Sequence, residues 1–322
     1  MGKDKKALAI IYSDVHLDLY HKYNKGYTRT LNGISVMKEV KLKAKLLKVP
    51  TLFAGDLISK EKFISNRLLS LILPPLYKIW GSEKYPTIGI TGNHDQCDEN
   101  TLEYTSPSYV KTFSEIFKGL FCIDNYSMDY GKLRIHGIPY LTHNLGLHTA
   151  IKERIKAIDS KQINILLLHT TLPGSQDNDG REQDSNISKR TMKLLKKFDI
   201  VFVGHIHKPM KLGKNVYQVG APNHQRKTDR EQDLGYCILY NDLSVEYIHL
   251  DKYPKFVELD YEENNPDTKN YYYNKSKVKV ANSDKIGSYS DTTNHVKLAK
   301  TYIKEKGIKD KAKKRALINI LK

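Results

Sequence analysis

Short apolar runs recur along the chain, and five of them end in polar residues of a chemically useful kind. These runs cover residues 7–12, 51–54, 87–91, 163–168 and 200–203. Runs of four to six aliphatic or β-branched residues are typical of buried strands. Residues 31–47 carry apolar side chains at helical spacing with lysines between them, and residues 64–73 form an apolar stretch that Pro74 and Pro75 are expected to end. The pattern predicts an α/β fold.

Beyond Gly204 the pattern changes to strands, at residues 216–219, 236–240 and 245–250. We expect a β-rich second half packed on the first, as a sandwich of two sheets with outer helices. After Pro254 the composition shifts again, with two short strands and then two basic helices, at residues 295–306 and 311–321. The predicted domains are a main α/β domain at 1–254, a reduced capping region at 255–290 and basic C-terminal helices at 291–322.

The polar residues that follow the strands supply carboxylate, imidazole and amide groups. They are Asp14, His16, Asp56, Asn93, His94, His169, His205 and His207. In α/β folds the chemistry collects where strands end and loops begin. This mixture of donors suits borderline divalent ions such as manganese, iron or zinc. We therefore expect a metal site that draws on both halves of the fold.

The donors divide into two sets around one shared carboxylate. Asp56 is the candidate bridge between two ions, because a carboxylate has two oxygen atoms and paired ions lie roughly 3.5–4 Å apart. The predicted ligand sets are Asp14, His16 and His207 for one ion and Asn93, His169 and His205 for the other. Such a pair can activate water against a phosphate ester. His94 would act on the departing oxygen, and Asp95 would hold the other nitrogen of that ring.

The charge and the cysteines limit the partners and the compartment. The formal net charge is +17, and residues 295–322 contribute +8 of it. Such a surplus is typical of proteins that bind polyanions, although a lysine-rich composition by itself also explains it. Three widely spaced cysteines indicate a reducing compartment, and the short apolar stretch near the N-terminus is neither a signal peptide nor a membrane span. The sequence predicts a cytoplasmic protein of a bacterial or virus-infected cell, with no membrane partner.

In the motifs that contain the predicted metal ligands, the sequence resembles the calcineurin-like metallophosphoesterases. Within that family it resembles the SbcD-type nucleases of DNA double-strand-break repair. The segments His136–Tyr140 and Val219–Arg226 carry the narrower match, which covers about residues 7–260. The resemblance implies a four-layer α/β/β/α sandwich, two manganese ions, and endonuclease and exonuclease activity on DNA. It also implies a homodimer and a partner ATPase of the SbcC type, for which the basic C-terminal helices are the candidate binding site.

The sequence departs from the family pattern in the loop after Asp56. Many relatives have His or Asp three residues after the bridging carboxylate, and this chain has Ser59. The same loop argues against a phosphoprotein phosphatase, because the Asp-Arg-Gly of that group is replaced by Ile58-Ser59-Lys60. The alternative function is a stand-alone phosphodiesterase or phosphatase on nucleotides or small esters. A binding module with an inactive site fits poorly, because every predicted ligand is present.

Several further residues have both a functional and a structural interpretation. Arg226, Lys227 and Arg230 are candidate contacts to DNA phosphates, or else a solvated loop. His224 either faces the site or is an ordinary histidine. Residues 172–186 are rich in Gly, Asp, Asn and Gln and predict a loop over the metal site. The apolar residues Leu68, Leu69, Leu71, Ile72 and Leu73 form either a dimer face or part of the core.

Overall fold

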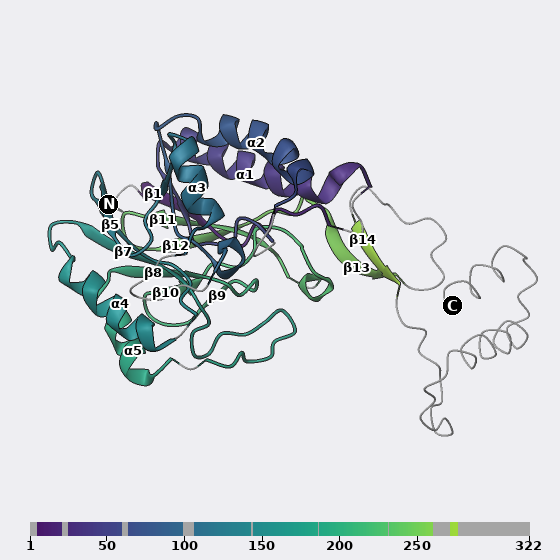
Figure 1. The fold of residues 1–322 in the computed structure, drawn as a ribbon. Helices are drawn as coiled ribbons and strands as arrows, with labels where there is room; N and C mark the ends of the chain where they lie inside the picture. Colours follow the sequence, from purple (N-terminus) through teal and green to yellow (C-terminus); the bar gives the residue numbers. More distant parts are fainter. Residues whose placement is uncertain are drawn as a thin grey trace, which may run out of the picture. The chain divides into compact units, whose positions relative to one another are not determined.

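Two six-stranded sheets packed face to face, with helices outside them, make up most of the part of the chain that can be described (Figure 1). The computed structural model describes residues 5–20, 25–59, 64–98, 106–142, 144–185, 187–230, 232–259 and 271–275. All of these residues fall within one compact unit, residues 1–275. The basic helices predicted within 291–322, and most of the capping region predicted at 255–290, lie outside the described residues. The predicted α/β sandwich is confirmed.

The first sheet has the strand order β12-β11-β1-β2-β3-β4. Its strands are β1 (Ala7–Tyr12), β2 (Thr51–Phe53), β3 (Thr87–Gly89), β4 (Leu120–Cys122), β11 (Gly235–Tyr240) and β12 (Val245–His249). Strands β1 to β4 run parallel, whereas β11 lies antiparallel to β1. Helices α1 (Thr28–Leu47), α2 (Asn66–Trp80) and α3 (Tyr109–Ile116) cover its outer face (Figure 1).

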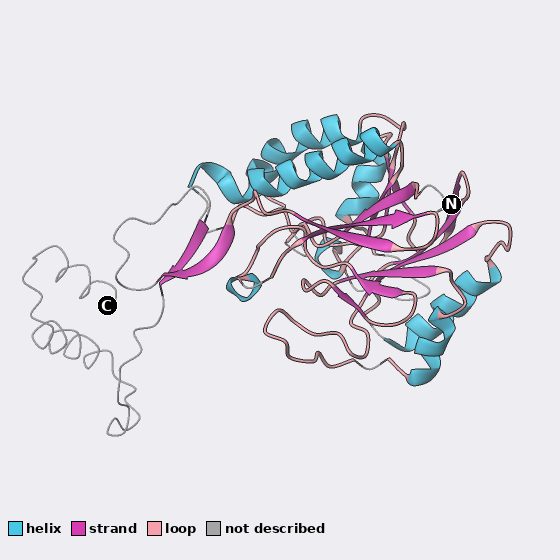
Figure 2. Ribbon diagram, turned by 180° about the vertical axis from the view of Figure 1, so that it is seen from behind, coloured by secondary structure: helices cyan, strands magenta, loops and turns pink. Residues whose placement is uncertain are grey.

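The second sheet has the order β5-β6-β7-β8-β10-β9. Its strands are β5 (Ser127–Tyr130), β6 (Leu133–Ile138), β7 (Ile163–His169), β8 (Ile200–Gly204), β9 (Met210–Lys211) and β10 (Val216–Gln218). Helices α4 (Asn144–Lys156) and α5 (Lys189–Leu195) pack on its outer side (Figure 2). Parallel strands that are buried on both faces read as continuous apolar runs, which is why the sequence showed them clearly.

Between the sheets lies an apolar layer to which both contribute. Ile11 and Leu52 of the first sheet lie in one cluster with Ile165, Leu167 and Phe202 of the second, and each is at most 1% exposed. At about 25 cal/mol per Å² of buried apolar area, side chains of this size stabilise the fold by roughly 1.5–3 kcal/mol each. This layer fixes the two sheets against each other, and so it fixes the strand ends that carry the polar residues.

The strands beyond Gly204 do not form a layer of their own, so that part of the sequence prediction is wrong. Strands β9 and β10 complete the second sheet, whereas β11 and β12 extend the first. The register pairs Ile10 with Ile238 and Ile11 with Cys237. Apolar periodicity identifies a strand but does not say which partner it takes, because the pairing depends on contacts more than 200 residues apart.

Helix α2 runs through Pro74 and Pro75 instead of ending at them, which corrects the expected boundary. Each proline removes one backbone donor, but the residues beyond them are strongly buried: Leu76 and Trp80 are 0% exposed. The Trp80 indole N–H also donates a hydrogen bond to Thr87 Oγ1 at 2.9 Å. Tertiary burial therefore outweighs the local cost of the two prolines.

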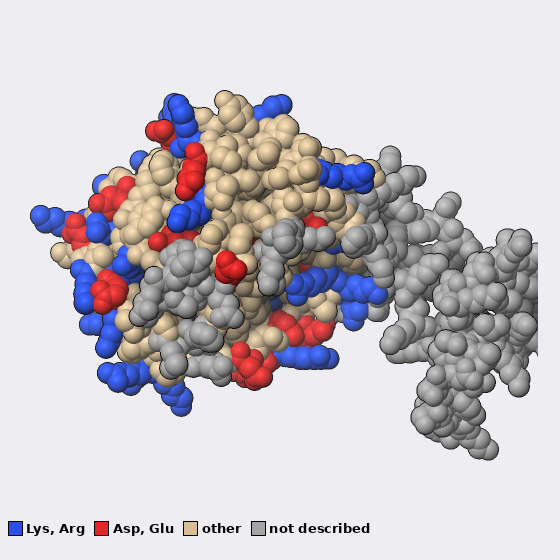
Figure 3. All heavy atoms as spheres, viewed as in Figure 1, with Lys and Arg blue, Asp and Glu red and all other residues tan. Residues whose placement is uncertain are grey.

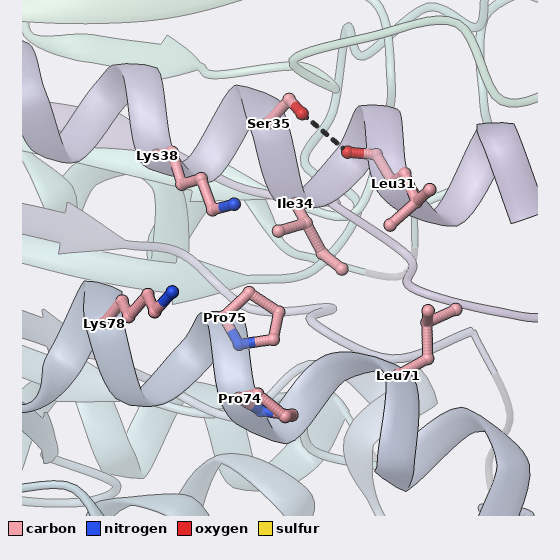
Figure 4. Close-up of a pocket in the computed structure, with 8 residues that line it drawn as sticks. All are labelled: Leu31, Ile34, Ser35, Lys38, Leu71, Pro74, Pro75 and Lys78. Atoms are coloured by element: carbon pink, nitrogen blue, oxygen red, sulfur yellow. Dashed lines mark hydrogen bonds between the residues drawn. The ribbon is translucent and has the colours of Figure 1, made fainter.

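A groove separates α1 from α2, and the two prolines lie on its wall (Figure 4). Its lining residues are Leu31, Ile34, Ser35, Lys38, Leu71, Pro74, Pro75 and Lys78. Part of the apolar pattern of α1 stays outside the core, since Leu42 and Leu46 are 59% and 71% exposed. In α2, Leu68 and Ile72 are buried in the core, so these two are excluded from the dimer face considered for residues 68–73.

Two short parallel strands, β13 (Lys255–Leu259) and β14 (Tyr271–Lys275), follow the sandwich in the chain. The backbone N–H of Phe256 donates a hydrogen bond to His224 Nδ1 at 3.1 Å, which ties β13 to the segment after β10.

Of the helices in the described residues, none is long and apolar enough to cross a membrane.

Candidate metal centre

The loops after β1 and β2 are hydrogen-bonded to each other, and this brings the first polar motifs together. Backbone N–H groups of Asp14 and His16 donate to the carbonyl oxygens of Gly55 (2.8 Å) and Asp56 (3.1 Å). Asp14, His16 and Asp56 have left-handed φ values of 52°, 48° and 61°. Such values are costly for residues other than glycine, and they persist where the surrounding structure dictates them. The backbone here is shaped to aim side chains inward.

One set of donors comprises Asp14, His16 and His207, whose ligand atoms all lie within 4.8 Å of one another. His16 Nε2 lies 3.2 Å from His207 Nε2 and 3.8 Å from Asp14 Oδ1. The three side chains are buried. This is the first of the two ligand sets that the sequence predicted, and the structure brings it together.

A second set, Asp56, His169 and His205, meets the same distance limit. His169 Nε2 lies 3.2 Å from Asp56 Oδ2. The Oδ1 atom of Asn93 lies 3.1 Å from His169 Nε2 and 2.9 Å from His205 Nδ1. Asp56 Oδ2 also lies 3.5 Å from His16 Nε2, so this carboxylate stands between the two sets. The expected position of Asp56 as the shared residue agrees with this geometry.

Asp95 does not hold the His94 ring, which corrects the role expected for it. Its carboxylate accepts hydrogen bonds from backbone N–H groups at 2.9–3.0 Å, namely those of Asp56, Leu57, Ile58 and Gly92. Asp95 therefore shapes the loop that carries the bridging carboxylate. A buried carboxylate is stabilised by several N–H donors, and the strained loop gains partners for its backbone.

The His94 ring is held by the chain backbone at position 59. His94 Nδ1 lies 3.2 Å from the carbonyl oxygen of Ser59, and the backbone N–H of His94 donates to Asp56 Oδ1 at 2.9 Å. The contact at position 59 uses a carbonyl group, which every residue type offers. The presence of Ser59, where many relatives have His or Asp, is therefore compatible with a correctly placed His94.

Burial and neighbouring charges set the protonation of the imidazoles. Burial lowers the pKa of His16 well below its usual value, and burial with the nearby His169 lowers the pKa of His205 to about 3. Burial acts on His169 in the same direction, but the Asp56 carboxylate outweighs it and raises the pKa of His169 to about 9. Neutral imidazole is the form that binds a metal ion, so His16 and His205 are already in that form near neutral pH.

The structure adds three residues that the sequence analysis did not assign to the site. Asp229 is fully buried, with Oδ1 3.7 Å from His207 Nδ1. Gln225 donates from its side-chain amide to the carbonyl oxygen of Asp14. The Tyr140 ring lies 5.7 Å from the His205 ring, centre to centre. All three belong to segments already noted for other reasons, but their direction toward the cluster is a tertiary property that no spacing reveals.

The three candidate DNA contacts and His224 were also predicted from the sequence, and none of them belongs to either ligand set. Arg226, Lys227 and Arg230 are exposed, in and beside the turn η3 (Lys227–Asp229). The backbone N–H of Arg226 donates to Asp229 Oδ2 at 2.9 Å, and Asp229 Oδ1 lies 3.7 Å from His207 Nδ1, so the backbone of Arg226 lies close to the cluster. His224 is a structural residue, because one ring nitrogen accepts from Phe256 N–H and the other lies 3.0 Å from the Gln232 carbonyl oxygen.

These residues fit a pair of divalent ions. Carboxylate, imidazole and amide donors converge in two groups, and one carboxylate lies between the groups. The ring nitrogens His16 Nε2 and His207 Nε2 also face each other directly, which is not the arrangement of a hydrogen-bonded network in a protein core. Two imidazole nitrogens in contact satisfy each other poorly unless one carries a proton or a cation lies between them. The donor chemistry is that of a borderline metal, and it does not by itself select manganese.

Comparison with known proteins assigns the fold and the site to a family. Residues 9–209 match the calcineurin-like phosphoesterases, and the chain belongs to this family. By sequence it is similar to the SbcD subunit of the SbcCD nuclease from Staphylococcus epidermidis, with 22% identity over 204 residues, which are 58% of this chain and 54% of that protein. The chain thus spans about half the length of that relative.

Among solved structures, the chain is similar to a Staphylococcus aureus protein assigned as a 5'-nucleotidase, solved in complex with alpha-ketoglutarate. The TM-score is 0.43 at 16% sequence identity, and the match covers 74% of this chain and 52% of that one.

Proposed function

We propose that this phosphoesterase is a two-metal DNA nuclease, with Asp14, His16 and His207 holding one ion and Asn93, His169 and His205 the other. The observation that carries the proposal is Asp56, whose Oδ2 lies 3.5 Å from His16 Nε2 and 3.2 Å from His169 Nε2, between both sets. When bound, a pair of divalent ions such as manganese supplies Lewis-acid activation of a phosphate ester and of water. The enzyme class, a hydrolase of phosphoesters, follows from the family.

Protein groups supply the positioning and the proton transfer. His94 Nδ1 donates to the Ser59 carbonyl oxygen, so the doubly protonated ring would give its Nε2 proton to the departing oxygen and return to the neutral Nδ1–H form. Asp95 acts on the loop that presents Asp56, so that the carboxylate and His94 keep their relative positions. The role of Asp95 in the proposal is therefore indirect.

DNA is the proposed substrate because cations lie beside the cluster. Figure 3 shows basic and acidic side chains interspersed over the face in view, without a single basic field. Local cations then matter more than the total charge, and Arg226, Lys227 and Arg230 are exposed in the segment around Asp229, whose Oδ1 lies 3.7 Å from His207 Nδ1. Lys and Arg contacts to phosphates position a nucleic acid without reading its sequence. The similarity to a nuclease subunit supports the same substrate.

The partners in this proposal are an SMC-like ATPase of the SbcC type and a second copy of the chain. The relative is named as a subunit of SbcCD, which supports the first partner. Leu42, Leu46 and Tyr77 on α1 and α2 are 59%, 71% and 66% exposed, and an apolar face of this kind is suited to a homodimer.

The test is cleavage of end-labelled linear DNA in the presence of Mn²⁺, beside hydrolysis of a small chromogenic phosphodiester. His94→Ala is expected to lower cleavage about 100-fold or more with metal still bound, since a general acid contributes roughly 10²–10⁴-fold. His249→Ala is the matched control, because His249 is exposed on β12. Cleavage of the small diester but not of DNA would move the substrate to nucleotides or small esters, and no hydrolysis of either would refute the proposal.

A further inference from the structure

Asp229 is a carboxylate buried beside the cluster without belonging to either ligand set. It is 0% exposed, and its two oxygen atoms have different neighbours. Oδ2 accepts from the backbone N–H groups of Gln225 (2.7 Å) and Arg226 (2.9 Å). Oδ1 accepts from the side-chain amide of Asn178 and lies 3.7 Å from His207 Nδ1. One oxygen thus shapes its own turn, and the other joins a metal-site histidine to a distant loop.

We propose that Asp229 is the positioning residue of His207 and that the hairpin around Asn178 docks on the same carboxylate oxygen. This inference rests on the proposed function, because it treats His207 as a metal ligand. It assigns a role to a residue that contacts neither the ions nor the substrate.

The physical argument starts from the two nitrogens of the His207 ring. An anion at Nδ1 favours the tautomer with the proton on Nδ1, and this leaves the lone pair of Nε2 for a metal ion. His207 Nε2 is the atom that faces the cluster, 3.2 Å from His16 Nε2. Asp229 therefore selects the ring form that binds metal and limits its rotation.

The hairpin is attached at more than one point. Gln176 and Glu182 form an antiparallel bridge, so the loop after β7 folds as a hairpin. The Gln232 side chain donates to the Asn178 carbonyl oxygen at 3.1 Å, and Lys208 Nζ donates to Gln176 Oε1 at 3.1 Å. Lys208 directly follows His207 in the chain. The hairpin is thus bound both to the residue after the ligand and to the carboxylate behind it.

Asp229→Asn separates the positioning role from a purely structural one. The amide oxygen can take the place of Oδ2 and keep the bonds from Gln225 and Arg226, while the amide nitrogen faces His207. The Asn178 Oδ1 atom is buried without a partner among the described residues, so a flip of that amide would keep the hairpin docked. The His207 ring alone must then change, moving its proton to Nε2, where it blocks metal binding.

The experiment is a titration of the full chain with Mn²⁺, in which binding is monitored by calorimetry and by Mn²⁺ electron paramagnetic resonance. The native chain is expected to bind two ions, and Asp229→Asn to weaken one of them about 10- to 100-fold, as loss of an outer-shell partner does. Asn178→Ala removes only the hairpin contact and is expected to change both affinities less than about threefold. Long-range ¹H–¹⁵N NMR spectra would show His207 changing from the Nδ1–H to the Nε2–H form.

The outcomes distinguish this inference from the proposed function. Two tight ions in both proteins with an unchanged His207 tautomer would overturn the role of Asp229 and leave the metal site intact. A native chain that binds no pair of ions would overturn the proposed function instead. If Asp229→Asn does not fold, the metal-free native protein at alkaline pH decides the matter, since Nδ1–H at His207 supports the inference and Nε2–H contradicts it.

Discussion

The two halves of the metal centre are supported in different ways. His169 donates from Nδ1 to the carbonyl oxygen of Ala54 at 2.7 Å, so the end of β2 holds this ring by main chain. His207 has a side-chain carboxylate, Asp229, behind it at 3.7 Å. The first support comes from the end of a central strand and the second from a turn that also carries a docked hairpin. One half is therefore held by main chain, and the other is held by side chains.

This difference decides which substitutions each half of the site is expected to tolerate. A Cβ added at Gly204 would lie 2.2 Å from the Ala54 carbonyl oxygen, so the strand ends around His169 have no spare space. Around His207 the contacts instead run through the side chains of Asp229, Asn178 and Lys208, which have rotamers to change. A main-chain support does not depend on a particular side chain, whereas a side-chain support is lost when that side chain is replaced.

The largest effect is expected at the residue that both halves share. Asp56→Asn should lower Mn²⁺-dependent DNA cleavage on the order of 10³-fold, because losing several kcal/mol of electrostatic stabilisation costs about that factor. Both ions should bind more weakly, which calorimetry would measure. Asp129→Asn is the control, since the Asp129 side chain is 54% exposed and pairs with Arg134 away from the cluster. An Asp56→Asn protein that still binds two ions tightly would mean that the halves are independent.

A smaller effect is expected from crowding the sheet-held half. In Gly204→Ala the new methyl group would meet the Ala54 carbonyl oxygen at 2.2 Å and His169 Nδ1 at 2.9 Å. The expected loss is about 1–3 kcal/mol in the free energy of unfolding of the metal-free protein, measured by urea denaturation. Gly213→Ala is the control, because its nearest neighbour is Val216 at 3.7 Å. Equal stability of the two variants would show that the strand ends yield more easily than we infer.

The smallest effect concerns protons released by the His169 half. Burial lowers the pKa of His169, but Asp56 raises it to about 9, so metal binding at about pH 7.5 should release about one proton from this ring and at about pH 9.5 only about a quarter of a proton. The raised pKa also stabilises the metal-free fold below about pH 6.5, and that contribution is lost as the pH rises through 9. Calorimetry in buffers of different ionisation enthalpy measures the release, and an equal value at both pH values would contradict this assignment.

The sequence predicted well which polar residues converge, because their signal is local. Each predicted ligand follows an apolar run, and the ends of parallel strands lie at one edge of a sheet. The grouping of Asp14 with His207 and of His169 with His205 followed from the donor types and the family resemblance, and the geometry agrees with it. The overall sandwich was predictable for the same reason.

What the sequence did not predict depends on contacts between distant segments. The partner of β11, the passage of α2 through Pro74, and the direction of Asp229 are all decided by burial against residues elsewhere in the chain. Asp95 is instructive, since its place beside His94 suggested a ring contact. Backbone N–H groups of the strained loop at Asp56 compete for the same carboxylate, and they win because an unpaired buried N–H is costly.

The pairing of β1 with β11 also has a consequence for how the chain is made. Strand β1 ends at Tyr12, and its antiparallel neighbour begins at Gly235, so more than 220 residues must be synthesised before that edge can close. At about 5–20 residues per second, one edge of the N-terminal strand waits roughly 10–45 s on the ribosome. An apolar edge exposed for so long invites pairing with other nascent chains. A chain that stops before Gly235 would keep that edge open permanently, and it would aggregate instead of accumulating as a shortened enzyme.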